Sequence, residues 1–290
     1  MKAIESRTVV ITGASSGIGR ASAVRLARSG FRVYAGIRAE ADAAVLRAEH
    51  PAIEPIAIDV TDAAAITAAR QRLERELDGL GGLVNNAGVG LVAPMEHVPL
   101  DEVRRQFEVD VFGQIAVTQA LLPLIRRARG RIVNMGSVGG QIAMPFGGVL
   151  CGCKSALHAM NDALRLELRP WGIHVCLIEP GSIRTPAVDK TLGDVDRAIL
   201  ALPPDGRAEY EDMLRAFHQR AYQREQSGSS PDVVARAVHH ALTAARPRIR
   251  YPVGQDARLL VALPRVLPDR WLDAIRIRLF GLPRGSSGAR

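Results

Sequence analysis

The sequence predicts an α/β fold in which about seven parallel strands form a doubly wound sheet within a single domain. Short apolar runs of β type alternate along the chain with longer stretches of helical periodicity. The strand runs show no inside–outside alternation, which indicates strands that helices cover on both faces. The length of 290 residues suits one large domain of this kind.

Each expected strand is a short run rich in apolar residues and bounded by polar or turn-forming residues. The runs, in chain order, are Thr8–Thr12, Arg32–Gly36, Pro55–Asp59, Gly82–Asn85, Arg131–Met135, His174–Glu179 and Ile249–Val253. After the first run we expect a helix over Ile18–Ser29, closed by Gly30. A Thr/Asp cap predicts another helix over Thr61–Leu77.

One long segment interrupts this alternation. Residues 184–228 carry no strand pattern, and a Pro-Pro-Asp-Gly turn at Pro203–Gly206 is expected to divide them. We call this segment the excursion. Its length and its place after the sixth strand are more typical of a part that covers a substrate than of a linker.

The last part of the chain, 256–290, differs in pattern from the domain expected over 1–255. From Asp256 on, Leu, Val, Ile and Trp alternate with arginine, which predicts an amphipathic helix broken by Pro264 and Pro268. We expect this tail to pack on the body of the domain or on a sister subunit. Contact of the tail with a membrane surface is the less favoured alternative.

Composition and charge narrow the class of protein. The net charge is +8, but the arginines are spread over the chain and aromatic residues make up only 4%, so no nucleic-acid partner is expected. No signal peptide opens the chain and no apolar run reaches about 18 residues, which predicts a cytoplasmic protein without a membrane span. Cys151 and Cys153 point apart on an expected helix, so we expect core thiols and no metal site.

A glycine-rich turn follows the first expected strand and leads into a helix. The glycines at positions 13, 17 and 19 would let backbone N–H groups approach a pyrophosphate at the N-terminus of that helix. The turn therefore predicts a Rossmann fold that binds a dinucleotide.

The end of the second expected strand indicates which dinucleotide is bound. An NAD(H) site usually offers a carboxylate there to the ribose 2′-hydroxyl, but this chain has Ile37 and Arg38, and no acid before Glu40. A guanidinium suits a 2′-phosphate, so Arg38 favours NADP(H) over NAD(H). The alternative is that Arg38 is one more surface arginine.

Several motifs, taken in order and spacing, resemble those of the short-chain dehydrogenase/reductase family. They are Thr12–Gly19, Asp59–Val60, Asn85–Gly88, Ser137, Lys154 and Pro180–Thr185, and the resemblance covers roughly residues 5–255. The stretches Gly136–Phe146 and Arg248–Ala257 are similar to the branch that contains 17β-hydroxysteroid and retinol dehydrogenases. The resemblance implies an oxidoreductase that acts on a small apolar alcohol or carbonyl substrate.

The resemblance also implies where NADP(H) would lie. The pyrophosphate would meet the glycine-rich turn, the adenine the end of the third strand, a ribose the end of the fourth, and the nicotinamide carboxamide the end of the sixth. The residues so implied are Gly13, Ser15, Ser16, Gly17, Ile18, Gly19, Asp59, Val60, Asn86, Ala87, Gly88, Pro180, Gly181, Ile183 and Thr185. Lys154 would hold the nicotinamide ribose, and helices near 101–127 and 149–169 would form a homodimer or homotetramer.

The family's catalytic set of Asn, Ser, Tyr and Lys is incomplete in this chain. Ser137 and Lys154 match, but Leu150 stands at the position of the tyrosine that transfers the proton. Asp110 replaces the asparagine, and we expect it either to pair with Lys154 or to hydrogen-bond the backbone as asparagine would. Among the tyrosines, Tyr210 and Tyr222 could supply a phenol only by folding over the pocket.

The missing tyrosine leaves two functions nearly balanced, with the first slightly favoured. The first is an NADP(H)-dependent oxidoreductase whose proton transfer is impaired or non-standard, through water held by Asp110 and Lys154, through Cys151, through the substrate itself or, less favoured, through His158. The second is a catalytically inactive NADP(H)-binding sensor or hetero-oligomer partner. A leucine introduced by engineering is a third explanation.

Overall fold

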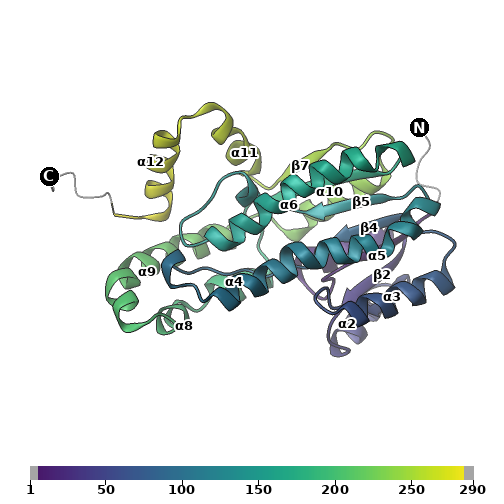
Figure 1. Ribbon diagram of the computed structural model, residues 1–290, viewed down its shortest axis with the longest axis horizontal. Coiled ribbons are helices and arrows are strands. Elements are labelled where there is room, and N and C mark those ends of the chain that lie inside the picture. The colour runs from purple at the N-terminus through teal and green to yellow at the C-terminus, as the bar shows by residue number, and fades with distance from the viewer. Residues whose placement is uncertain (1–5, 284–290) are drawn as a thin grey trace.

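The computed structural model describes residues 6–283, which form one parallel sheet of seven strands (Figure 1). The spatial order is β3-β2-β1-β4-β5-β6-β7. The strands are β1 (Thr8–Ile11), β2 (Arg32–Ile37), β3 (Ile53–Ala57), β4 (Gly82–Asn85), β5 (Arg131–Met135), β6 (His174–Pro180) and β7 (Arg250–Val253). The predicted doubly wound Rossmann sheet in a single domain is therefore confirmed. Its order reverses between β1 and β4, where such sheets open a crevice at the carboxyl ends of the strands.

Helices cover both faces of the sheet, because the strands carry apolar side chains on both (Figure 1). One buried core lies between the sheet and α1 (Gly17–Arg28), α2 (Ala41–Glu49) and α10 (Pro231–Thr243). The other lies between the sheet and α3 (Ala63–Glu76), α5 (Gly113–Arg127) and the C-terminal part of α6 (Gly148–Glu167). Every residue of β4 and β5 is buried, which explains why these runs lack polar alternation.

The ends of the elements follow local chemistry. The carboxylate of Asp62 caps α3 by accepting hydrogen bonds from the backbone N–H groups of Ala64 and Ala65, at 2.8 and 3.2 Å. The third strand was expected at Pro55–Asp59, but it begins earlier because Ile53 pairs in register with Val33 of β2. Proline at Pro55 is compatible with this outermost strand of the sheet.

One long helix brings Asp110 to the site. It consists of α4 (Leu100–Phe107), a π-helical turn (η2, Glu108–Phe112) and α5, and it runs without a break over Leu100–Arg127. By length and composition this helix could cross a membrane, contrary to the expectation that the chain holds no such segment. Half of its most apolar stretch is buried inside the fold, however, and this burial accounts for its composition.

The excursion forms three helices, α7 (Pro186–Leu192), α8 (Val195–Leu200) and α9 (Pro204–Gln226), and no strand. They contribute Ile199, Leu214 and Phe217 to a small separate core that also includes Val92 of the body and Phe280 of the tail. The Pro-Pro-Asp-Gly sequence was expected to be the dividing turn, but its second proline begins α9. A proline in the first turn loses no helical hydrogen bond, so the break lies just before it.

The tail forms two helices, α11 (Ala257–Val266) and α12 (Asp269–Phe280), and α12 folds back against α9 (Figure 1). Only one of the two expected proline breaks is found, because α11 includes Pro264 and the chain turns at Pro268. The rings of Phe280 and Phe217 lie 5.2 Å apart, and Arg220 donates a hydrogen bond to the carbonyl of Arg278 at 2.8 Å. Residues 284–290 of the expected tail lie outside the described residues.

Candidate active site

A cavity of about 360 Å³ lies at the carboxyl ends of β4, β5 and β6. Helix α6 forms one wall, and the excursion and the tail close the outside. Most of the lining is apolar. The ionisable side chains in it are Asp110, Cys151, Lys154, Arg224, Glu225 and Arg276. An apolar cavity with a few converging polar groups is typical of a site for a small molecule.

The predicted site residues divide into two groups. One group lines the cavity: Ile18, Gly88, Asp110, Ser137, Leu150, Lys154, Pro180, Gly181, Ile183 and Thr185. The other lies outside it, on the glycine-rich turn and at the ends of β2, β3 and β4: Gly13, Ser15, Ser16, Gly17, Gly19, Arg38, Asp59, Val60, Asn86 and Ala87. The two groups together follow the carboxyl edge of the sheet from β3 to β6, which is the course an extended dinucleotide requires.

The glycine-rich turn fits a pyrophosphate. A Cβ atom on Gly19 would lie 2.3 Å from the carbonyl oxygen of Gly13, so no side chain fits there. Asn86 holds the turn from behind by donating hydrogen bonds to the carbonyls of Thr12 and Gly13, at 3.0 and 2.9 Å. Ser16 at the N-cap of α1 makes no side-chain cap, which leaves the first N–H groups of α1 available to an anion.

The other end of the crevice presents Arg38 and Asp59. The carboxylate of Asp59 accepts hydrogen bonds from the backbone N–H and the hydroxyl of Thr61, at 2.9 and 2.8 Å. The backbone bond chiefly lowers the pKa of Asp59, and the positive charge of Arg38 acts in the same direction. Among residues 6–283, no hydrogen bond or ion pair engages the Arg38 guanidinium, so it is free to meet a phosphate.

Ser137, Lys154 and Leu150 share the inner end of the cavity. Ser137 lies two residues after the end of β5, and its Oγ accepts a hydrogen bond from the N–H of Gly139 at 3.0 Å. Lys154 lies on α6 and donates to the carbonyl of Met135 at 3.3 Å. Leu150 lies one turn earlier on the same face of α6, so an apolar side chain fills the place expected for the tyrosine.

Asp110 enters this group from the π-helical turn, and both interactions expected for it are present. Its Oδ1 lies 3.5 Å from Nζ of Lys154 and accepts a hydrogen bond from the N–H of Val89 at 3.2 Å. Its Oδ2 accepts from Gln106 at 3.3 Å. A Cβ atom on Gly88 would lie 2.5 Å from Oδ1, so glycine is required for this close approach. The fully buried carboxylate of Asp110 thus has polar partners on both of its oxygens.

No tyrosine replaces the missing one. All four tyrosines belong to the described part of the chain, and none lines the cavity. Tyr210 donates to Glu96, and Tyr222 donates to Asp189 at 2.9 Å, both on the exterior. The excursion does fold over the pocket as such a substitute would need, but its two phenols face outward.

His158 and Cys151 differ in what they can offer as proton donors. His158 does not line the cavity, because its buried ring packs behind Gly136 and Gly140, and burial lowers its pKa to about 4. His158 is therefore a packing histidine, and the less favoured proton route through it is not supported. Cys151 does line the cavity, but burial raises the pKa of its thiol, which makes it a weak acid.

Three ionisable residues of the cavity were not anticipated: Arg224, Glu225 and Arg276. They come from the end of α9 and from α12, where helical periodicity gives no sign of which face meets the strand ends. Oε2 of Glu225 accepts a hydrogen bond from the N–H of Ile183 at 3.3 Å. Burial raises the pKa of this carboxyl.

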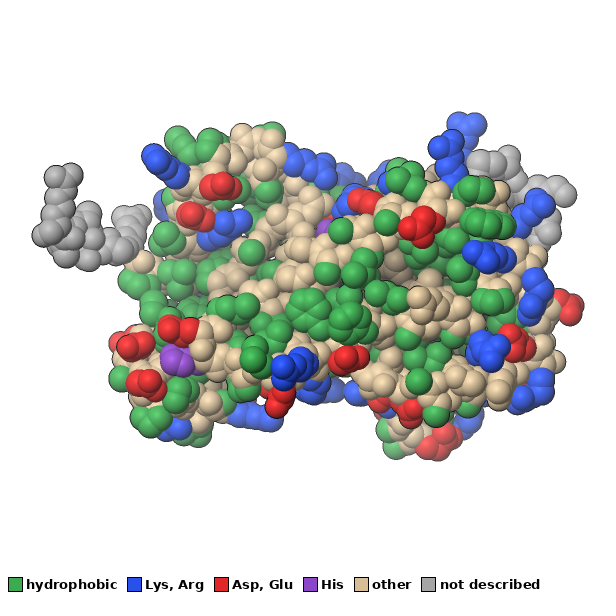
Figure 2. Space-filling view, viewed as in Figure 1, with side chains coloured by type: hydrophobic (Ala, Val, Ile, Leu, Met, Phe, Trp, Pro, Cys, Tyr) green, Lys and Arg blue, Asp and Glu red, His purple; other side chains and the backbone are tan. Residues whose placement is uncertain are grey.

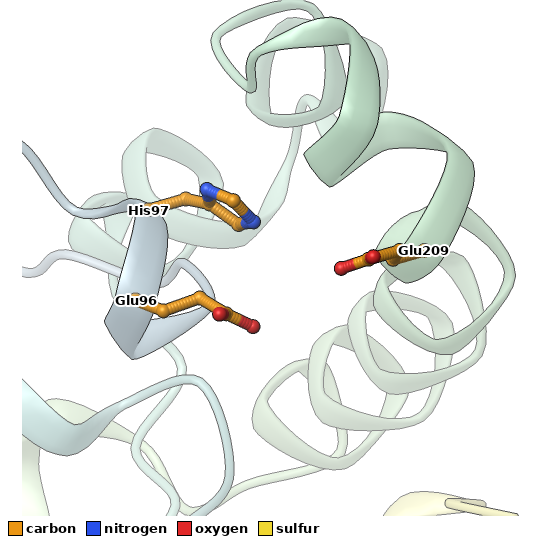
Figure 3. A group of neighbouring side chains, drawn as sticks. All are labelled: Glu96, His97 and Glu209. Atoms are coloured by element: carbon orange, nitrogen blue, oxygen red, sulfur yellow. The ribbon is translucent and has the colours of Figure 1, made fainter.

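A second group of polar side chains lies away from the cavity (Figure 3). Glu96 and His97, on a short 3₁₀ turn (η1, Met95–His97), face Glu209 of α9, and their nitrogen and oxygen atoms lie within 4.8 Å of one another, as metal ligands would. Both carboxylates are exposed, and Tyr210 already donates to Glu96. The group is sufficiently explained as a contact that fastens the excursion to η1.

Comparison with known proteins identifies the family. The sequence model described as short chain dehydrogenase matches residues 7–195. Retinol dehydrogenase 5 of Homo sapiens is 38% identical over 278 residues, which cover 92% of this chain and 86% of that protein. The NADPH-dependent 3-dehydrocapnine reductase of Ornithobacterium rhinotracheale is 32% identical over 277 residues, which cover 93% of this chain and 95% of that protein.

A solved structure agrees over almost the whole length. The crystal structure of a short chain dehydrogenase from Burkholderia cenocepacia J2315 in complex with NADP is similar with a TM-score of 0.72 at 25% identity, covering 96% of this chain and 99% of that one. The glycine-rich turn, the order of the sheet and these relatives agree, and the chain belongs to the short-chain dehydrogenase/reductase family of oxidoreductases, in which it resembles the retinol dehydrogenase branch.

Proposed function

We propose that this chain is an NADP(H)-dependent oxidoreductase that interconverts an apolar alcohol and its carbonyl compound, by a proton route that does not use a tyrosine. The observation that carries the proposal is the shared cavity: Ser137 and Lys154 line it together with the strand-end residues Pro180–Thr185. A substrate in this cavity would therefore lie between the serine and the expected place of the nicotinamide.

The preference for NADP(H) rests on Arg38. Its guanidinium follows β2, next to the carboxylate of Asp59, and Ile37 occupies the position where an acid would favour NAD(H). The names of two relatives point the same way, since one is an NADPH-dependent reductase and the other was solved with NADP.

The residues of the cavity have distinct roles in this proposal. When bound, the reduced nicotinamide supplies a hydride to the carbonyl carbon. The hydroxyl of Ser137 accepts from Gly139 and can donate its own proton to the substrate oxygen, which orients the carbonyl. Lys154, paired with Asp110, presents its ammonium to the nicotinamide ribose. Leu150 offers no proton to the developing alkoxide.

An apolar substrate is supported by the lining of the outer cavity. Ile142, Met144, Phe217, Leu260 and Leu279 lie there, from both sides of the opening. Burying such a surface against a hydrocarbon skeleton contributes about 25 cal/mol per Å². A retinoid is one candidate class, because several curated relatives are named retinol dehydrogenases.

The second candidate is a non-catalytic NADP(H)-binding protein, and Leu150 is the observation that favours it. The residues that the resemblance implies for cofactor binding are all present in the sequence. The residue expected to donate the proton is instead a leucine, whose side chain cannot ionise. Both candidate functions predict that the chain binds NADP(H), but only the oxidoreductase predicts that it converts a substrate.

The test therefore has two stages. NADPH and NADH are first titrated by the change in dinucleotide fluorescence, and NADPH should bind more tightly. The preference should shrink by about 1–3 kcal/mol in Arg38→Ala, the range of a charge-assisted hydrogen bond, and should persist in Arg47→Ala, an exposed arginine of α2. Lys154→Ala should weaken the binding of both dinucleotides.

A panel of carbonyl compounds that includes retinal and phenanthrenequinone is then offered with NADPH. Consumption of NADPH with formation of the alcohol supports the oxidoreductase. Tight NADPH binding without turnover of any compound supports the binding protein, and equal affinity for NADPH and NADH contradicts the cofactor assignment.

A further inference from the structure

One acid in the cavity has no role in the family pattern: Glu225, in the last turn of α9. Its Oε2 accepts a hydrogen bond from the N–H of Ile183 at 3.3 Å, and Ile183 belongs to the strand-end segment expected to meet the nicotinamide. The carboxyl group therefore lies at the reacting end of the cavity. It comes from α9, whereas Leu150 and Lys154 come from α6.

Within the described residues, the carboxyl group of Glu225 forms no ion pair with an arginine or lysine. Its neighbour Arg224 donates to the hydroxyl of Ser182 at 3.2 Å and forms an ion pair with Asp256, which precedes α11. Burial raises the pKa of Glu225, and the charge of Asp256 adds to this, whereas hydrogen bonds from Ser182 and Ile183 and the charge of Arg224 oppose it. The carboxyl thus keeps its proton to a higher pH than an exposed glutamate does.

The other ionisable groups of the cavity are poor proton donors. Asp110 and Lys154 are engaged with each other, with Oδ1 and Nζ 3.5 Å apart, and Nζ of Lys154 also donates to the carbonyl of Met135. The thiol of Cys151 holds its proton tightly because burial raises its pKa. Arg224 and Arg276 carry guanidinium groups, which do not give up a proton in proteins.

We propose that Glu225 is the proton donor of this site and replaces the acidic group that Leu150 lacks. The inference rests on the proposed oxidoreductase function. In the reduction, a C–H bond forms as the carbonyl carbon accepts hydride from the dihydronicotinamide, and the electron pair of the C=O π bond moves to oxygen. That oxygen takes the proton of the Glu225 carboxyl, directly or through one water, and solvent then reprotonates the carboxylate. In the oxidation, the carboxylate accepts the proton of the alcohol.

The sign of the pH dependence follows from these roles. Reduction requires the neutral carboxyl, so its rate should fall as the pH rises through the raised pKa of Glu225. Oxidation requires the carboxylate and should show the opposite trend. The groups that face Glu225 are Arg224, Asp256, Ser182 and the backbone of Ile183, and Lys154 and Arg276 line the same cavity.

The direct test is Glu225→Gln, which keeps the shape and the hydrogen bond to Ile183 but cannot give a proton. With NADPH and phenanthrenequinone or retinal as probes, kcat should fall roughly 10²- to 10⁴-fold, the usual contribution of general acid catalysis. The dissociation constant of NADPH should stay within about threefold, because a single neutral hydrogen bond is retained. The alkaline decline of the reduction rate should disappear. Glu211→Gln, on the exposed side of the same helix, is the matched control and should leave both quantities unchanged.

A double substitution separates proton transfer from a structural role. Leu150→Tyr places a second acid in the cavity, so Glu225→Gln should cost much less in the Leu150→Tyr background than in the native chain. Equal losses in both backgrounds would show that Glu225 acts on structure and would overturn the proposal.

Three further outcomes test the assignment of Glu225 and the oxidoreductase function separately. If the native chain reduces the probes and Glu225→Gln reduces them equally well, the assignment of Glu225 is wrong and the oxidoreductase function stands. If Glu225→Gln loses NADPH binding, Glu225 is a cofactor-binding residue and the proposal fails. If the native chain binds NADPH and reduces none of the panel, the oxidoreductase function itself is overturned, and Glu225 with it.

Discussion

Leu150 stands where the resemblance to the family places a tyrosine. Its side chain lines the cavity one helical turn before Lys154, so a phenol at this position would lie near the ammonium that lowers a tyrosine pKa in the family. We predict that Leu150→Tyr raises the rate of carbonyl reduction by up to about 10²- to 10⁴-fold in the Glu225→Gln background, where the proposed donor is absent, and by a smaller factor in the native chain. The larger ring could cost about 1–3 kcal/mol in packing without abolishing the fold.

Leu150→Phe is the control for this prediction, because it adds the ring without the hydroxyl. Rates are compared at saturating NADPH on the same carbonyl panel. A Leu150→Tyr protein that binds NADPH and reacts no faster than Leu150→Phe would show that the substrate cavity, and not only the acid, has changed.

His158 supports the loop that carries Ser137. Cβ atoms on Gly136 and Gly140 would lie 2.6 and 2.4 Å from its ring, so the imidazole fills the space behind this loop. Burial lowers its pKa from 6.5 to about 4, with the charges of Arg250 and Lys154 acting in the same direction. The folded protein therefore excludes a proton that the unfolded chain would bind.

Stability should consequently depend on pH in a definite direction. The contribution of neutral His158 is complete above pH 6.5 and is lost as the pH falls toward 4. The free energy of unfolding from urea titrations should drop over this range by up to about 3 kcal/mol from this residue. The drop should be smaller in His158→Gln and unchanged in His50→Gln, a partly exposed histidine after α2. Identical pH slopes in all three proteins would contradict the account.

Helix α9 is held in place by Phe217. This fully buried ring lies 5.2 Å from Phe146 and 5.2 Å from Phe280, so it joins the excursion to the loop before α6 and to the tail. Phe217→Ala should lower the free energy of unfolding by about 3–5 kcal/mol, measured by urea denaturation. Leu200→Ala, on an exposed position of the same excursion, should change it by less than about 0.5 kcal/mol. A small loss in both variants would show that α9 is not anchored there.

The inner strands β1, β2, β4, β5 and β6 could be predicted because they are short, mostly apolar runs that are almost fully buried, whereas the edge strands β3 and β7 are only partly buried. The proline-containing helices could not be predicted. The sequences around the proline in the first turn of α9 and around Pro264 inside α11 are also typical of turns. Only the packing of these helices against the body of the domain makes them helical. Among the site residues, Ser137 and Lys154 were expected from their match to the family's motifs and both line the cavity, whereas the position of Glu225 depends on the orientation of α9, which the sequence does not show.

The exposed face of the front helices indicates how whole molecules associate. Hydrophobic side chains gather over α4 and α5 on the face shown in Figure 2. Phe112, between α4 and α5, is 50% exposed, and Met160 and Leu166 of α6 are 41% and 58% exposed. An apolar patch on a monomer is typical of a contact with another subunit. We predict a homodimer or homotetramer formed through these helices.

Leu166→Asp should shift the protein toward monomer in sedimentation or light-scattering measurements, because it places a charge in the expected contact. Val45→Asp makes a comparable change on α2, which covers the opposite face of the sheet from α5 and α6 and where the side chain is 46% exposed, and should leave the assembly intact. A native protein that is monomeric at every concentration would exclude the contact.

The outer wall of the cavity has a consequence for how the chain is made. The segments expected to meet the dinucleotide phosphates, β1 to β3, leave the ribosome before α9 and α12 do. A growing chain can thus form its dinucleotide crevice while the apolar pocket is still open to water. Because a ligand stabilises whichever state binds it, a dinucleotide cofactor would stabilise the partly synthesised chain, whereas a substrate would find a complete cavity only after the tail has packed on the excursion.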